Sequence, residues 1–260
     1  MIKAVFFDID GTLVSFKTHK LPDSTVRALD LLREKGIKVF IATGRQLQSI
    51  NNLGTQEFDG YVTLNGGYCL AGKDKVIYKH NIPSGDIEAL IRYQENEEAF
   101  PCALVEEDGI YQNYVDDSVR QLYDMLDFPH PPLRPLRGNG GKEVYQLIAF
   151  FSPGHEERIM SVLPHCEATR WNPLFADVVP RGSSKAVGID KIIEYYGISL
   201  HETMAFGDGG NDMAMLRHAG IGVAMANGAP ETLAAADLTA PSNEEDGVAQ
   251  ILSRWFPPNT

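Results

Sequence analysis

Cysteine is scarce in this chain of 260 residues, and the histidines form no cluster. The three cysteines, Cys69, Cys102 and Cys166, lie far apart, and none belongs to a Cys-x-x-Cys pair. The seven histidines are scattered and form no His-Glu-x-x-His arrangement. These absences argue against a disulfide framework and against a thiolate zinc site, so we expect a reducing, cytoplasmic environment.

Long basic runs and long apolar runs are also lacking. The formal net charge is -12 at pH 7, and no Lys/Arg run supplies the dense positive surface that nucleic acid or an anionic membrane requires. The apolar run from Ala4 to Phe7 stops at Asp8, far short of a signal-peptide core. No stretch approaches the roughly 20 apolar residues that span a bilayer. We therefore expect a soluble protein with no nucleic-acid partner and no membrane partner.

Apolar residues make up 43% of the sequence and charged residues 22%, which is ordinary for a globular protein. Its first part alternates strands, predicted at 3–7, 37–41 and 61–64, with helices that begin at 22–23 and near 46. The same alternation returns in strands at 203–206 and 221–224 and helices at 186–196, 211–218, after 230 and up to about 255. Uninterrupted apolar strands joined by helices predict an α/β fold, a Rossmann-like doubly wound parallel sheet.

The middle of the chain has a different pattern. Strands at 102–106 and 110–113 flank an Asp108-Gly109 turn, and further strands at 144–151, 167–171 and 175–179 alternate with helices at 87–93, 119–126 and 156–163. The Pro-, Gly- and Arg-rich segment 129–141 predicts an exposed loop. We therefore expect residues 1–82 and 182–260 to form the core and residues 83–181 an inserted α+β cap domain.

Three polar segments directly follow predicted strands of the core. Asp8-Ile9-Asp10-Gly11-Thr12 places two carboxylates two residues apart, with a glycine that permits a tight turn. Carboxylate oxygens are the ligands that suit magnesium, although Asp-Gly also marks ordinary turns. Thr43-Gly44 offers a hydroxyl and an approachable N–H to a phosphate, although a Thr before a helix is also a common N-cap.

The third segment, Gly207-Asp208-Gly209-Gly210-Asn211-Asp212, concentrates acidic and amide side chains among glycines. A simple turn does not need so many carboxylates, and their mutual repulsion favours a bound cation. Because ligands bind beyond the carboxyl ends of parallel strands, we expect the three segments to meet at one edge of the sheet. Lys185 begins a helix, where its charge opposes the macrodipole; this points to a function, although a solvated lysine is the ordinary alternative.

These four segments, in this order, resemble the motifs of the haloacid dehalogenase superfamily of phosphotransferases. The large insertion between Thr43 and Lys185 looks like the α/β cap of the Cof-type sugar phosphatases, subclass IIB, as does Asn65-Gly66-Gly67 after the third strand. One departure is Lys185-Ala186, where relatives often have Lys-Gly. The resemblance spans nearly the whole chain.

The resemblance implies a magnesium-dependent phosphomonoester hydrolase. Asp8 would be the nucleophile, which becomes an aspartyl-phosphate, and Asp10 the general acid and base. The implied phosphate-binding residues are Thr43, Gly44, Lys185 and Asn211. Mg2+ would be bound by the Asp8 carboxylate, the Asp10 backbone carbonyl and Asp208, with Asp212 and Arg45 behind these ligands.

The cap would select the leaving group of a small phosphate ester, most plausibly a hexose or related sugar phosphate. Asn65 and Gly66 are candidate selectors, together with the polar cap residues Lys142, Tyr145 and Arg170. Two alternatives stay open: a sugar phosphomutase, and a phosphometabolite-binding module without turnover. No coiled-coil pattern is visible, and we expect a monomer.

Overall fold

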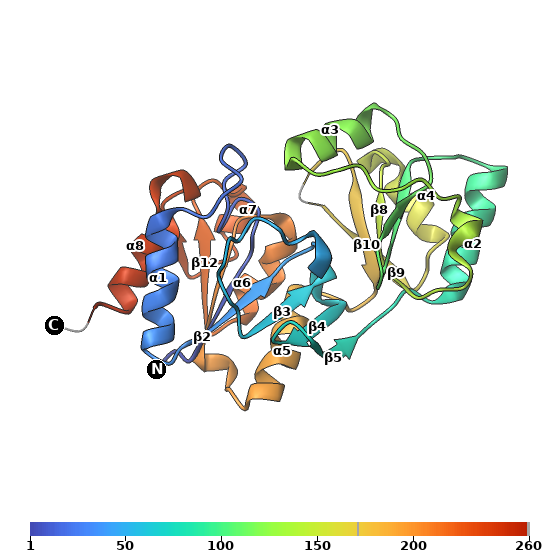
Figure 1. The fold of residues 1–260 in the computed structure, drawn as a ribbon. Coiled ribbons are helices and arrows are strands. Elements are labelled where there is room, and N and C mark those ends of the chain that lie inside the picture. Colours follow the sequence, from blue (N-terminus) through green and yellow to red (C-terminus); the bar gives the residue numbers. More distant parts are fainter. Residues whose placement is uncertain (171, 259–260) are drawn as a thin grey trace. The chain divides into compact units, whose positions relative to one another are not determined.

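A computed structural model describes residues 1–170 and 172–258 of the chain (Figure 1). It divides into two compact units, which we call the core unit and the cap unit. The core unit comprises Met1–Lys79 and Ser184–Thr260, and the cap unit comprises His80–Ser183. No helix among the described residues has the length and apolar character needed to cross a membrane.

The core unit is built on an eight-stranded sheet in the order β13-β12-β11-β1-β2-β3-β4-β5. All neighbours from β13 to β3 are parallel, whereas β4 and β5 are added antiparallel at one end. The strands are β1 (Ala4–Phe7), β2 (Lys38–Ala42), β3 (Gly60–Thr63), β4 (Tyr68–Ala71), β5 (Lys75–Lys79), β11 (Thr203–Gly207), β12 (Ile221–Met225) and β13 (Leu238–Ala240). The α/β prediction with a mostly parallel sheet is therefore confirmed.

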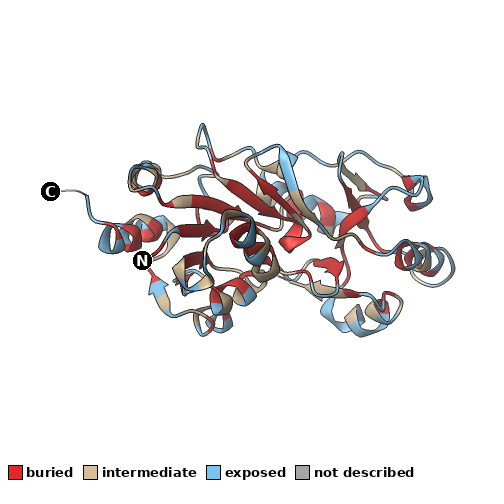
Figure 2. Cartoon of the chain, turned by 90° about the horizontal axis from the view of Figure 1, so that it is seen from below, coloured by how far each residue is buried: buried red, intermediate tan, exposed pale blue. Residues whose placement is uncertain are grey.

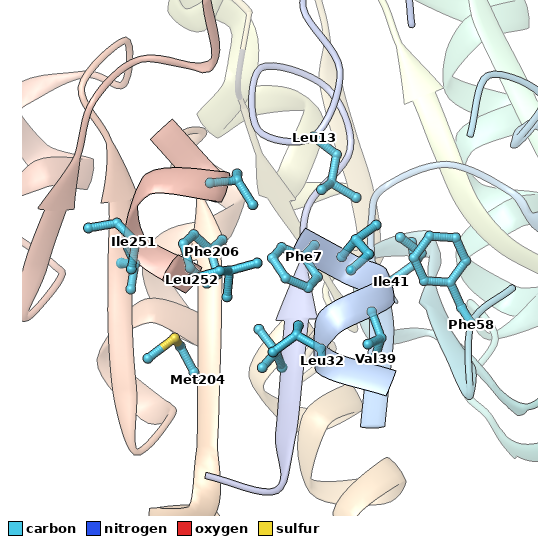
Figure 3. Close-up of a cluster of buried hydrophobic side chains, with 14 of the residues drawn as sticks. Phe7, Leu13, Leu32, Val39, Ile41, Phe58, Met204, Phe206, Ile251 and Leu252 are labelled. Carbon is cyan, nitrogen blue, oxygen red and sulfur yellow. The ribbon is translucent and has the colours of Figure 1, made fainter. Parts of the chain in front are cut away.

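Helices cover both faces of this sheet, which explains why its central strands are apolar at every position. On one face, α1 (Asp23–Glu34) and α8 (Gly247–Trp255) lie side by side and contribute Leu32 and Ile251 to a cluster with Phe7 and Phe206 (Figures 1 and 3). The opposite face is covered by α5 (Lys185–Tyr196) and α6 (Met213–His218), whereas α7 (Pro230–Leu233) is a single short turn. Figure 2 shows the central strands as buried.

The connection between β2 and β3 differs from the prediction. We expected an α-helix from about Gln46, but the structure has only the 3-10 turn Leu47–Ser49. The guanidinium of Arg45 donates from Nη1 to the carbonyl oxygen of Ser49 at 3.2 Å. In a continuing helix this carbonyl oxygen would accept a hydrogen bond from a backbone N–H instead. The hairpin of β4 and β5 was not predicted, because its strands are short and partly exposed.

The cap unit contains a separate antiparallel sheet in the order β7-β6-β8-β10-β9. Its strands are β6 (Cys102–Glu106), β7 (Ile110–Gln112), β8 (Val144–Ala149), β9 (Cys166–Thr169) and β10 (Ala176–Pro180), and its helices are α2 (Ser84–Asn96), α3 (Asp117–Leu126) and α4 (Glu156–Ser161). Helices α2 and α4 share one apolar cluster with the sheet, and α3 packs into a second one. The strand expected to reach residue 171 ends at Thr169, and residue 171 itself lies outside the described residues.

Most residues of the segment 129–141 are exposed, as we expected, but two of them are buried. It contains the 3-10 turn Leu136–Asn139, in which Leu136 and Asn139 are buried. Arg134 donates hydrogen bonds from Nη1, at 3.2 Å, and from Nη2 to the buried carboxylate of Glu106 in β6. A charge pair with a residue distant in sequence therefore holds this segment against the cap sheet.

Candidate active site

Three chain segments meet beyond the carboxyl ends of the parallel strands. In the sheet register, Phe7 at the end of β1 lies beside Ile41 of β2 and Phe206 of β11. The segments that follow these strands therefore leave the sheet at the same level, and hydrogen bonds link their side chains: Thr12 to Asp208 and Arg45 to Asp10. The structure thus brings together the three polar segments that the sequence separates widely.

The turn after β1 depends on Gly11. Its φ of +85° lies in the left-handed region, and a Cβ there would lie 2.1 Å from Oδ2 of Asp208. Glycine therefore allows the backbone of this turn to approach the carboxylate from the other segment. The next residue, Thr12, donates from Oγ1 to Oδ1 of Asp208 at 2.8 Å.

Lys185 links two of the aspartates. Ser184 caps α5 by accepting a hydrogen bond from the Val187 N–H, which places Lys185 in the first helical turn. The fully buried Nζ of Lys185 donates to Oδ1 of Asp8 at 2.7 Å and to Oδ1 of Asp212 at 2.5 Å. Burial alone lowers the Lys185 pKa, but the charges of Asp212 and Asp8 outweigh it and hold the pKa above the ordinary lysine value.

Asp212 organises the segment that carries Asp208. Its Oδ2 accepts hydrogen bonds from the backbone N–H groups of Asp208, at 2.9 Å, and Gly209, at 2.8 Å. With Lys185 on Oδ1, both oxygens of the buried Asp212 carboxylate are occupied. Asp212 therefore fixes the conformation of this segment and the position of Lys185.

The residues fit a divalent cation. Asp8, Asp208 and Asp212 offer carboxylate oxygens that all lie within 4.8 Å of one another, the only such group among the described residues. Burial and the nearby charge of Asp212 raise the Asp8 pKa well above its ordinary value and raise the Asp208 pKa to about 7. A bound cation would relieve this cost, and carboxylate oxygens suit Mg2+. Because Asp212 already accepts three hydrogen bonds, Asp8 and Asp208, which accept fewer, are the better ligands.

Arg45 pairs with Asp10. Its Nε donates to Oδ2 of Asp10 at 2.7 Å and its Nη2 donates to Oδ1 at 2.5 Å, an ion pair with two parallel bonds. The Arg45 side chain is only 7% exposed, and Nη1 donates to the carbonyl oxygen of Ser49 and, at 3.4 Å, to Oδ1 of Asn52. The sequence left the partner of Arg45 open, and the structure shows that it holds Asp10.

Three of the predicted phosphate-binding residues, Thr43, Gly44 and Asn211, lie beside Asn65. Asn211 donates from Nδ2 to Oδ1 of Asn65 at 3.0 Å, and a Cβ on Gly44 would lie 3.1 Å from Nδ2 of Asn65. The hydroxyl of the buried Thr43, which directly follows β2, accepts a hydrogen bond from the Arg45 N–H at 3.1 Å. Asn65 therefore braces Asn211 against Gly44, and its selector role stays a prediction.

Gly66, the second predicted selector, has a structural requirement of its own. Its φ is +92°, and a Cβ there would lie 2.0 Å from the carbonyl oxygen of Ser184. The residues before it, Leu64 and Asn65, also have positive φ values, both 51°. This turn after β3 therefore packs directly against the residue that caps α5.

The polar cap residues nominated from the sequence all have partners inside the cap unit. Lys142 pairs with Asp108, the Tyr145 hydroxyl donates to Glu143, and Arg170 donates to Glu156. Their role in substrate selection stays a prediction.

Sequence reasoning missed Asn227, which follows β12 at the same edge of the sheet. Its Nδ2 donates to the carbonyl oxygen of Gly11 at 2.8 Å and lies 3.4 Å from Oδ2 of Asp208. The signal that could have found it is the position of an amide side chain shortly after a predicted parallel strand, where ligands of such sheets bind.

Comparisons with known proteins agree with this geometry. Residues 5–252 match the family model of the haloacid dehalogenase-like hydrolases. The putative phosphatase YkrA of Bacillus subtilis is 35% identical over 252 residues, which cover 95% of each protein. From the same organism, the 5-amino-6-(5-phospho-D-ribitylamino)uracil phosphatase YitU is 29% identical over 266 residues, covering 97% of each.

Among solved structures, the subclass IIB sugar phosphatase BT4131 superposes with a TM-score of 0.89 and 42% identity, covering 97% of this chain and 98% of that chain. The similarity extends over both units, and the acidic cluster and the buried lysine come from three of the four motif segments. The chain therefore belongs to the haloacid dehalogenase-like hydrolases, as a phosphatase of the Cof-type subclass IIB that acts on small phosphorylated metabolites.

Proposed function

We propose that the protein is a Mg2+-dependent sugar phosphatase that works through an aspartyl-phosphate on Asp8. The observation that carries the chemistry is the buried Lys185 ammonium, bonded to Asp8 and Asp212 beside Asp208. The substrate class rests on the 42% identity with a sugar phosphatase. The name of YitU likewise describes a phosphate ester on a polyhydroxylated carbon chain, which supports the same class.

In the first step, a carboxylate oxygen of Asp8 forms a bond to phosphorus while the bond from phosphorus to the sugar oxygen breaks. Asp10 in its carboxylic acid form gives its proton to that departing oxygen. Lys185 orients Asp8 through the 2.7 Å bond to Oδ1 and places a positive charge beside the phosphoryl oxygens.

In the second step, the Asp10 carboxylate takes a proton from water, and the water oxygen bonds to phosphorus. The bond between phosphorus and the Asp8 oxygen breaks, which releases inorganic phosphate and restores the Asp8 carboxylate. Thr43, Gly44 and Asn211 are the proposed phosphate ligands in both steps. The pair of hydrogen bonds from Arg45 keeps Asp10 in one position between its two tasks.

Mg2+ would be held by the carboxylates of Asp8 and Asp208 and the backbone carbonyl of Asp10. When bound, it neutralises negative charge on the phosphoryl group and on the aspartates. The cap unit is the proposed source of selectivity for the leaving group.

The test is a panel of phosphate esters assayed with Mg2+, comparing Asp8→Asn with the parent. We expect hexose and other sugar phosphates to give the highest kcat/KM, and the substitution to lower kcat by about ten-thousand-fold or more. The exposed Asp30→Asn on α1 is the control and keeps full activity. Full activity of Asp8→Asn would contradict the covalent route.

The product distinguishes the remaining alternatives. Free phosphate released in equal amount to the sugar supports a phosphatase, whereas an isomerised sugar phosphate with little free phosphate indicates a phosphomutase. Mg2+ binding without turnover across the whole panel would indicate a binding module.

A further inference from the structure

Asn227 connects two segments that carry the proposed metal ligands. One amino group, Nδ2 of Asn227, lies 2.8 Å from the carbonyl oxygen of Gly11 in the segment after β1 and 3.4 Å from Oδ2 of Asp208 in the segment after β11. An amide NH2 group carries two hydrogens, so one side chain can donate to both acceptors. A third strand end, that of β12, is thereby tied to the other two.

The orientation of this amide is determined by its other end. Oδ1 of Asn227 accepts a hydrogen bond from the backbone N–H of Asn243 at 3.1 Å. A backbone N–H can only donate, so the carbonyl side of the amide must face Asn243 and the NH2 side must face Gly11 and Asp208. The main chain of the C-terminal segment therefore decides which group of Asn227 reaches the site.

The Asp208 carboxylate is consequently held from several sides. Thr12 donates to Oδ1 at 2.8 Å, Asn227 approaches Oδ2, and Gly11 lies so close that a Cβ would be 2.1 Å from Oδ2. The backbone after β12 also approaches the main chain of Asp208, because a Cβ on Gly228 would lie 2.7 Å from its carbonyl oxygen. The contacts from Thr12, Asn227 and Gly11 oppose rotation of the carboxylate, which the neighbouring charges of Asp8 and Asp212 would otherwise repel.

We propose that Asn227 is a positioning residue of the metal site: it holds the Asp208 carboxylate at the separation from Asp8 that a divalent cation requires. This inference rests on the proposed Mg2+ site. Partners that orient a metal ligand typically change metal affinity by about 10- to 100-fold when they are removed. The effect of Asn227 should therefore appear in cation binding before any substrate is present.

The experiment measures the dissociation constant of the substrate-free protein for Mg2+, from the Mg2+ dependence of Tm and from displacement of Mn2+ followed by electron paramagnetic resonance. For Asn227→Ala and Asn227→Ser we expect the Mg2+ dissociation constant to rise about 10-fold or more. At saturating Mg2+, kcat should return to within about threefold of the parent, because Asp8, Asp10 and Lys185 are unchanged.

Asn243→Ala is the matched control. The bond to Asn227 comes from the main chain of Asn243, so this substitution removes only the 3.4 Å contact from Nδ2 to the Val14 carbonyl oxygen. We expect its Mg2+ dissociation constant to stay within about twofold of the parent.

The outcomes separate the two hypotheses. If the parent protein itself binds no Mg2+, the proposed metal-dependent function fails. If the parent binds Mg2+ and the Asn227 variants bind it equally well, the inference about Asn227 is wrong while the function stands. A purely structural role for Asn227 would lower Tm equally with and without Mg2+ and would leave the dissociation constant unchanged.

Discussion

At the residue scale, the aspartates of the site differ in how many hydrogen-bond donors reach them from the described residues. Asp212 receives three donors, from Lys185 and from two backbone N–H groups. Asp208 receives Thr12 and Asn227, whereas Asp8 receives Lys185. A carboxylate with few donors keeps lone pairs for a cation or for phosphorus. This difference explains how similar, neighbouring side chains can take separate roles.

The Arg45–Asp10 ion pair predicts a dependence on the leaving group. If Arg45 orients Asp10 as the acid, Arg45→Ala should lower kcat/KM for a hexose phosphate by about 100-fold or more, because general-acid catalysis typically contributes that much. For 4-nitrophenyl phosphate, whose leaving group departs without a proton, we expect a loss below about tenfold. The measurement is kcat/KM for both esters, since it reports formation of the aspartyl-phosphate.

Two further variants calibrate this prediction. Asp10→Asn should show the same dependence on the leaving group, whereas Arg92→Ala, an exposed arginine on α2, should change neither rate. Equal losses on both esters for Arg45→Ala would show that Arg45 does not act through Asp10.

The raised pKa of Asp208, about 7, predicts how pH and Mg2+ act together. Without metal, the folded pKa lies above the ordinary value of 3.8, so the stability from this group is fully present below about pH 4 and is lost as pH rises through 7. Mg2+ binds the deprotonated carboxylate, so its dissociation constant should be about 100-fold higher at pH 5 than at pH 8. Asp8, whose pKa is also raised, acts in the same direction.

The measurement is the increase in Tm produced by Mg2+ between pH 5 and pH 8. We expect this increase to grow with pH and to become small and flat in Asp208→Asn. An increase that is independent of pH in the parent would contradict the assignment of Asp208 as a ligand.

At the element scale, α5 carries Lys185 and packs directly on β3. Gly188 makes this contact possible, because a Cβ there would lie 2.2 Å from Cγ1 of Val62. Valine is stiff about χ1 and cannot easily move away. The close approach therefore fixes the depth at which the Lys185 ammonium enters the site.

Gly188→Ala should destabilise the protein by about 1–3 kcal/mol through overpacking, although alanine favours helix by about 1 kcal/mol. Its control is Gly85→Ala in α2, where nothing lies within 4 Å of the added Cβ and we expect unchanged or slightly higher stability. Urea unfolding of both variants measures the change. Equal stability in the two variants would show that α5 can shift without cost.

The sequence pattern predicted several elements correctly, and the prediction that failed did so for a physical reason. Strand β6 and helix α1 begin where the apolar pattern and the Pro22-Asp23 signal predict. The helix expected from Gln46 does not form, because Arg45 bonds the Ser49 carbonyl oxygen while it reaches Asp10. A local pattern could not reveal this, since Asp10 lies 35 residues away along the chain.

At the scale of the whole molecule, each unit has an apolar core of its own. The core unit contains the cluster around Phe7 and a second one around Phe40, and the cap unit contains those around Leu147 and Phe175. From the sequence we expected the domain boundaries at 82/83 and 181/182. In the structure the chain passes from one compact unit to the other at 79/80 and 183/184. Independent cores favour independent folding of the inserted segment.

We therefore predict that a fragment comprising residues 80–183 folds alone. Its expected signatures are dispersed amide resonances and a cooperative thermal transition. The control fragment carries Leu147→Asp, which places a charge in the cap cluster and should abolish both signatures. A disordered parent fragment would show that the cap unit needs the rest of the chain.

The sequence by itself determined the parallel core, the inserted segment and the four chemical motifs, because apolar periodicity and the spacing of polar residues after strands are local properties. Only the tertiary structure decided which groups meet: Lys185 with Asp8 across 177 residues, Thr12 with Asp208 across 196 residues, and Asn227 with Gly11 across 216 residues. These pairs depend on the order and register of strands in one sheet, and on glycines that let backbones approach, neither of which a local pattern contains.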